Sequence, residues 1–106
     1  MNSLLAKLLD AVAVTGPGPT TVLRSSGDLA TFQVVGGTTA GAGAVSVNIE
    51  VSNDGANWMT VGAVSLVLST TASSDGFVST TVWPYTRANV VSISGTGASV
   101  SATMGR

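Results

Sequence analysis

Residues 45–52 alternate between apolar and polar side chains, and this period of two is the feature that most limits the fold. The apolar positions are Val45, Val47, Ile49 and Val51, and the polar positions are Ser46, Asn48, Glu50 and Ser52. Successive side chains of a β-strand point to opposite faces of the sheet. The segment therefore predicts a strand with one face on a core and the other toward water or a partner.

The same period recurs in other short segments. Ala30, Phe32 and Val34 alternate with Thr31, Gln33 and Val35, and Val64, Leu66 and Leu68 alternate with Ser65, Val67 and Ser69. Glycine-containing turn signals separate the segments: Asp54-Gly55, the stretch 70–76 that Asp75-Gly76 closes, and Gly95-Thr96-Gly97. Roughly seven or eight short strands at this spacing predict an all-β domain, either an antiparallel β-sandwich or a jelly-roll-like barrel.

The first residues follow a different period. Their apolar side chains have helical spacing, with Ser3 as a candidate N-cap, at Leu4, Leu5, Leu8, Leu9 and Val12. We therefore predict an amphipathic helix over residues 1–14, a Gly/Pro linker over 15–19 and a β-sandwich over 20–106. A helix this short needs a surface to dock on. The leucines pack either on their own domain or, as an interface stripe, on a neighbouring subunit.

Charged residues are scarce for a domain of this size. They make up 8% of the 106 residues, against a typical share of about 25%, while 44% are hydrophobic. Either neighbours in an assembly cover much of the surface, or a neutral Ser/Thr coat is simply hydrated. The four basic residues are scattered, which argues against nucleic acid as a partner. No apolar run reaches the 18 or so residues that a membrane span requires.

The residues that catalysis and metal binding most often use are missing or explained locally. The chain has no histidine and no cysteine, which excludes Ser-His-Asp and Cys-His sites, the usual zinc sites and disulfides. Two of the five carboxylates, Asp54 and Asp75, lie in predicted turns. We therefore expect neither enzymatic activity nor a cofactor or metal.

The aromatic residues are the remaining candidates for a binding site. Trp58, with Asn57 beside it, could stack on a sugar as in a carbohydrate-binding module, or the tryptophans could close the ends of a valine-rich core. Arg87 is expected to pair with a carboxylate, either within the domain or across an interface. Trp83, Tyr85 and Arg87 are predicted as interface or framework residues.

Three motifs in residues 45–105 carry a resemblance. "SNDGANW", "YTRANV" and "GTG" begin at residues 52, 85 and 95. The chain resembles short β-sandwich proteins encoded among the virion genes of tailed bacteriophages, in which a Ser-Asn-Asp-Gly-x-x-Trp turn precedes a Tyr-x-Arg-Ala-x-Val strand and a Gly-Thr-Gly hairpin. Residues 1–14 lie outside the match.

The resemblance implies a structural role without catalytic residues. The expected role is a capsid cement (decoration) protein, with a head-tail or tail component as the alternative. Such proteins are made in the host cytoplasm and become part of the virion, where the partners would be the major capsid protein or other virion proteins and further copies of the chain, as a dimer or trimer. A carbohydrate-binding module that uses Trp58 is the alternative of a different class.

Overall fold

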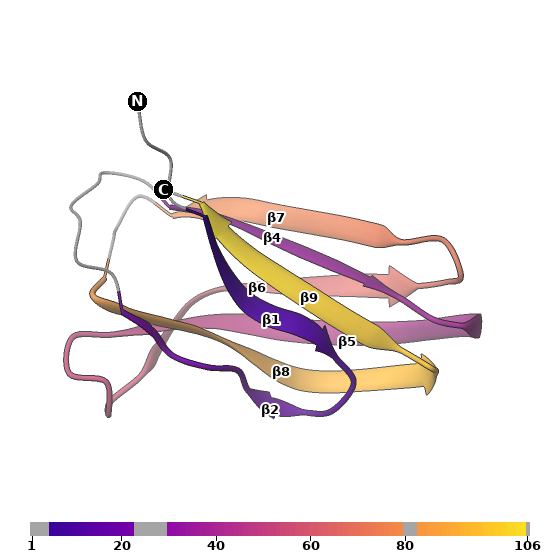
Figure 1. Ribbon diagram of the computed structural model, residues 1–106, viewed down its shortest axis with the longest axis horizontal. Coiled ribbons are helices and arrows are strands. Elements are labelled where there is room, and N and C mark those ends of the chain that lie inside the picture. The colour runs from indigo at the N-terminus through magenta and orange to yellow at the C-terminus, as the bar shows by residue number, and fades with distance from the viewer. Residues whose placement is uncertain (1–4, 23–29, 80–82, 106) are drawn as a thin grey trace.

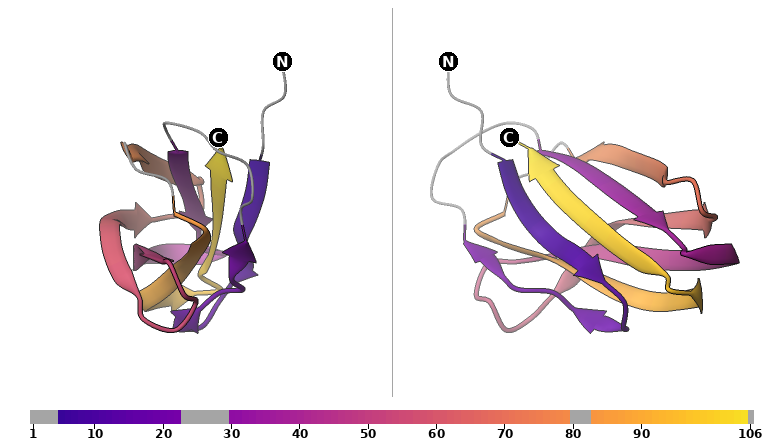
Figure 2. Two further views of the ribbon diagram at one scale, coloured as in Figure 1. Left: turned by 90° about the vertical axis from the view of Figure 1, so that its left-hand side faces the viewer. Right: turned by 45° about the vertical axis from the view of Figure 1, so that its right-hand side comes forward.

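Two antiparallel sheets form the fold in the computed structural model, which describes residues 5–22, 30–79 and 83–105 (Figure 1). One sheet has the order β1 (Leu5–Val12), β9 (Ser99–Gly105), β4 (Ala30–Gly37) and β7 (Ser73–Ser79). The other has the order β2 (Gly16–Pro17), β8 (Tyr85–Thr96), β5 (Ala40–Ser52) and β6 (Met59–Leu68), and β3 (Thr21–Val22) also pairs with β8. The predicted all-β fold is confirmed, and the sheets face each other as in a sandwich (Figure 2).

The core lies between the sheets, where the period-two patterns meet. The predicted inward side chains of β4, β5 and β6 are all buried: Ala30, Phe32, Val34, Val45, Val47, Ile49, Val51, Val64, Leu66 and Leu68. The polar positions Ser46, Asn48 and Glu50 of β5 lie on the opposite face, as the alternation predicts, whereas Ser52 at the end of β5 is buried. β8 and β9 add Ala88, Val90, Val100, Ala102 and Met104 to the core. Small and β-branched side chains dominate it, which suits a pleated, buried surface.

The predicted helix over residues 1–14 is wrong wherever the structure describes this segment. Leu5–Val12 is strand β1, which pairs with β9. Leu8 and Leu9 are adjacent, yet both are buried, with exposed fractions of 0% and 1%. A register shift between Lys7 and Leu9 makes this possible, since a β-bulge adds one residue and turns the strand.

The leucine pattern that suggested a helix is therefore the pattern of a bulged strand. Leu8 and Leu9 belong to the core of their own domain and are not an exposed docking stripe. Leu5 contributes backbone pairing with Gly105, and Leu4 lies outside the described residues. Within the predicted linker, Gly16 and Pro17 pair with β8.

Two of the three predicted turns hold. Gly55 (φ 77°), between β5 and β6, and Gly97 (φ 63°), between β8 and β9, adopt the left-handed backbone that favours glycine. The turn predicted over residues 70–76 is correct only in its first part, because Asp75 and Gly76 lie inside β7 and pair with Val34 and Gln33. The chain turns at residues 69–72.

The consecutive strands β6 and β7 belong to different sheets, so their connection closes one side of the sandwich. Phe77 of β7 packs on Phe32, with ring centroids 5.1 Å apart. A Cβ atom at Gly62 of β6 would overlap the Phe77 ring. A glycine in β6 therefore lets an aromatic ring join the two sheets at this side.

Because Leu9 is part of the core, we expect Leu9→Ala to lower the free energy of unfolding by about 2–5 kcal/mol, from lost burial and the cavity left behind. Urea denaturation followed by circular dichroism measures the change. Val14→Ala is the control, since Val14 is 69% exposed and its truncation should change stability by less than about 0.5 kcal/mol. Equal effects at both positions would contradict the core assignment of β1.

Candidate functional site

The turn between β5 and β6 is organised by the hydroxyl of Ser52. Ser52 Oγ accepts hydrogen bonds from the backbone N–H of Asp54 (3.1 Å) and of Gly55 (2.9 Å), and it donates to Asp54 Oδ1 (2.7 Å). Ser52 is buried, so these bonds replace the water that its hydroxyl would otherwise need. The last residue of β5 thus fixes the start of the turn.

The carboxylate of Asp54 holds the rest of the turn. Oδ1 accepts from the N–H groups of Asn57 and Ala56, both at 2.9 Å, and Oδ2 accepts from Asn57 Nδ2 at 2.8 Å. Led by the Asn57 backbone N–H, these bonds and the Ser52 hydroxyl hold the pKa of Asp54 well below its usual range. Asp54 therefore serves as an internal anchor of the turn.

Beyond the turn, Trp58 meets a polar cluster on the outer face of the five-stranded sheet. The Arg87 guanidinium carbon lies 4.1 Å from the centre of a Trp58 ring. Arg87 Nε also donates to Glu50 Oε1 at 2.7 Å, and Asn89 Nδ2 donates to Glu50 Oε2 at 3.2 Å. Arg87 therefore pairs with a carboxylate of its own domain, which answers the question that the sequence left open.

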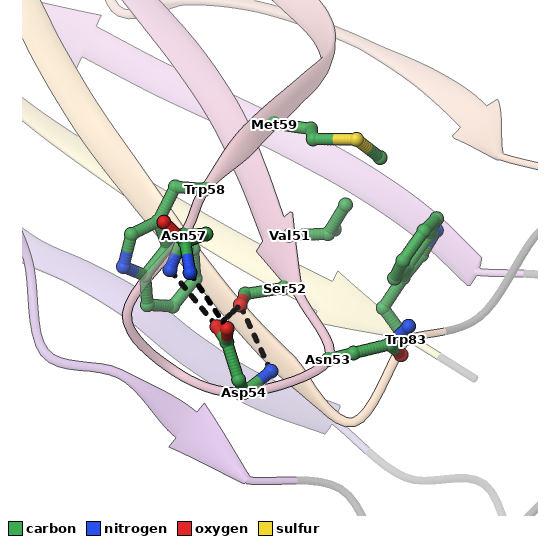
Figure 3. A pocket seen from close by; sticks show the side chains of 8 residues that line it. All are labelled: Val51, Ser52, Asn53, Asp54, Asn57, Trp58, Met59 and Trp83. Carbon is green, nitrogen blue, oxygen red and sulfur yellow. Dashed lines mark hydrogen bonds between the residues drawn. The ribbon is translucent and has the colours of Figure 1, made fainter.

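A shallow pocket of about 320 Å³ lies beside this turn (Figure 3). The residues that line it are Val51, Ser52, Asn53, Asp54, Asn57, Trp58, Met59 and Trp83. Figure 3 shows the Trp58 ring on one side of the hairpin and the Trp83 ring on the other. The two indoles consequently do not form one continuous stacking platform.

The structure gathers most of the predicted candidates at one end of the molecule. Asn57, Trp58 and Trp83 line the pocket, Arg87 stacks on Trp58, and the Tyr85 ring lies 3.6 Å from the position of a Cβ at Gly55. Leu8 and Leu9 lie elsewhere, in the core.

Sequence reasoning missed Glu50 and Asn89 as partners of Arg87, and it missed Ser52 as the centre of the turn. The alternation along β5 already places Glu50 on the outward face, and this pattern was the sign in the sequence that could have identified it. Pairing of β5 with β8 places Arg87 directly opposite Glu50, but sequence alone did not reveal which strands are neighbours.

This arrangement is better suited to holding the corner together than to binding a sugar. The Asn57 amide already donates to Asp54, and the Arg87 guanidinium covers one face of Trp58. Within the described ranges, no three or more acidic side chains come close enough to hold a metal ion. The same ranges contain no helix long and apolar enough to cross a membrane.

Comparisons of the chain with protein-family models, with curated proteins and with solved structures found no match.

The lowered pKa of Asp54 predicts a pH-dependent stability. Because this pKa lies below the unfolded value of about 3.9, the stabilisation is complete above that value and is lost as the pH falls toward the lowered folded pKa. We expect the melting temperature of the wild type to exceed that of Asp54→Asn at neutral pH, and the gap to narrow below about pH 4. Circular dichroism melts across this range measure it, with Asp10→Asn as an exposed control. A gap that stays constant into acid would contradict the role of the ionised carboxylate.

The pairing of Arg87 with Glu50 predicts that substitutions at the two positions change the unfolding free energy non-additively. The two side chains are only 23% and 13% exposed, so Arg87→Met, which leaves Glu50 without its charged donor, should cost about 1.5–3 kcal/mol of unfolding free energy. A double-mutant cycle with Glu50→Gln isolates the interaction. Ser65→Ala on the same face is the matched control and should change stability by less than about 0.5 kcal/mol. Additive effects of Arg87→Met and Glu50→Gln would show that the pair contributes nothing.

Proposed function

We propose that the chain is a non-catalytic structural protein of a bacteriophage virion, a capsid decoration protein that packs on the major capsid protein and on copies of itself. The observation that carries the proposal is the near absence of net charge on the two broad outer faces of the sandwich. The resemblance of residues 45–105 to virion proteins points to the same role.

The outer face of the four-stranded sheet is lined by hydroxyl, amide and apolar groups. Strand register places these described residues on it: Thr31, Gln33, Val35, Ser74, Val78, Ser101 and Thr103. Lys7, at the margin on β1, is paired with Asp10 at 3.4 Å. Val35 and Val78 are 36% and 57% exposed. Such a face can be buried at little cost in desolvated charge.

The outer face of the five-stranded sheet has a similar character. Ser46, Ser65 and Ser92 lie side by side across β5, β6 and β8, and Val67 is 80% exposed. Its charged residues Glu50 and Arg87 neutralise each other. Contacts of about 1,600 Å² on such faces, repeated around a shell, would stabilise it by multivalency even if each contact is weak.

The carbohydrate-binding alternative has less support, because Asn57 and one face of Trp58 are already occupied within the domain. A head-tail or tail position is compatible with the same neutral faces. The location of the protein on the particle separates that alternative from decoration of the shell.

The proposal is tested by adding purified protein to heads of the parent phage prepared without it. We expect saturable binding of many copies per shell and a higher melting temperature of the shell by calorimetry. Val78→Lys and Val67→Lys each place a charge on one outer face, and at least one should weaken binding, because the charge would be desolvated in the contact. Val14→Lys, between β1 and β2, is the control. The proposal would be overturned in favour of the carbohydrate module if the protein did not bind to heads but bound glycans on an array in a way that Trp58→Ala abolished.

A further inference from the structure

The chain contains two Asp-Gly dipeptides, Asp54-Gly55 and Asp75-Gly76, in very different surroundings. We infer that Asp75 is a site of spontaneous conversion to isoaspartate and that Asp54 is protected from the same reaction. This inference goes beyond the proposed function and does not depend on it.

The reaction needs no reagent other than water. The backbone nitrogen of the glycine attacks the side-chain carbonyl carbon of the preceding aspartic acid, the new C–N bond forms, and the carboxyl oxygen and two protons leave as water. Water then opens the cyclic imide at either carbonyl and restores aspartate or yields isoaspartate. The attack requires a glycine nitrogen that no other group holds away from the carboxyl group. It also requires the neutral form of that carboxyl group, because only the neutral form can lose its hydroxyl oxygen as water.

Asp54-Gly55 meets neither requirement. The N–H of Gly55 donates to Ser52 Oγ at 2.9 Å, which holds the nitrogen away from the Asp54 carboxyl group. Both oxygens of the carboxylate accept hydrogen bonds from Asn57, and Ser52 and Ala56 bind Oδ1 as well. These bonds lower the pKa of Asp54 and so make its neutral form scarce.

Asp75-Gly76 differs from Asp54-Gly55 in the direction of its glycine N–H. The dipeptide is exposed and lies in β7, the outermost strand of its sheet. The Gly76 N–H is directed at Asp75 Oδ1, 2.8 Å away, so the nucleophile already faces the group that it attacks. Glycine has no side chain to block the approach.

The fold explains why an aspartate and a glycine occupy positions 75 and 76. A Cβ at Gly76 would overlap the carbonyl oxygen of Phe32, so no other residue fits there without a shift of the backbone. Asp75 pairs with Val34 and shares its face of the sheet. An inward-pointing charge on an edge strand discourages pairing with another chain. The same aspartate that protects the edge strand β7 therefore forms the reactive Asp75-Gly76 dipeptide.

Isoaspartate would alter β7 itself. The main chain would gain one methylene group at residue 75, so the register of residues 75 to 79 with β4 could no longer be kept. We therefore expect the altered chain to lose the contacts of β7 first and those of the central strands later.

The experiment incubates the folded wild-type protein near pH 6, well below its melting temperature. Digestion with an endoproteinase that cleaves before aspartate but not before isoaspartate, followed by mass spectrometry, reports both sites in one sample. We expect isoaspartate at residue 75 to exceed that at residue 54 by at least about tenfold, because Ser52 holds the Gly55 nitrogen and the neutral form of the Asp54 carboxyl group is scarce. The same incubation in denaturant should bring the two rates close together.

Variants test the cause of the difference. Ser52→Ala removes the bond to the Gly55 nitrogen and should raise isoaspartate at residue 54 several-fold, and Asn57→Ala, which removes only the amide donor to Asp54, replaces it if Ser52→Ala does not fold. Asp75→Ser should abolish the signal at residue 75 and leave residue 54 unchanged. Equal conversion at both sites in the folded protein, or conversion in denaturant alone, would overturn the inference.

Discussion

Burial of one face of β5 is the constraint on which the rest of the structure depends. This strand lies between β6 and β8, and its inward valines and isoleucine occupy the middle of the core. A one-residue slip would turn the whole apolar set to the outside, so the register is strongly specified. That register also places Glu50 outward, opposite Arg87, and delivers Ser52 to the beginning of the turn. The candidate site is thus a consequence of the core.

Sequence patterns predicted those parts of the fold in which local period and tertiary placement agree. The alternations along β4, β5 and β6 identified strands and their inward faces correctly. They failed for β1, where a bulge lets Leu8 and Leu9 point inward together and imitates helical spacing. The turn signal at Asp75-Gly76 was also misleading. It has the same local signature as Asp54-Gly55, but both residues lie inside β7, where Phe32 leaves no room for a Cβ at Gly76.

The candidate site was also predictable only in part. The turn motif and the aromatic residues near it were visible in the sequence, and Asn57, Trp58, Tyr85 and Arg87 do gather around one corner. Their roles depended on strand order, which periodicity does not supply. Once β8 is known to lie beside β5, Arg87 finds Glu50 within the domain, and Trp58 lies against the guanidinium. The polar groups of the corner therefore bond largely to one another, which leaves the neutral sheet faces as the broader surfaces for contact.

The position of β9 determines when the domain can complete its fold during synthesis. β9 lies between β1 and β4, so β1 has no sheet partner among the described residues until the chain has been made through residue 105. Ribosomes add about 5–20 residues per second, so β1 stays without its sheet partner for several seconds. An unpaired strand offers its backbone N–H and C=O groups to other chains, so the late synthesis of β9 leaves β1 open to such pairing during that time.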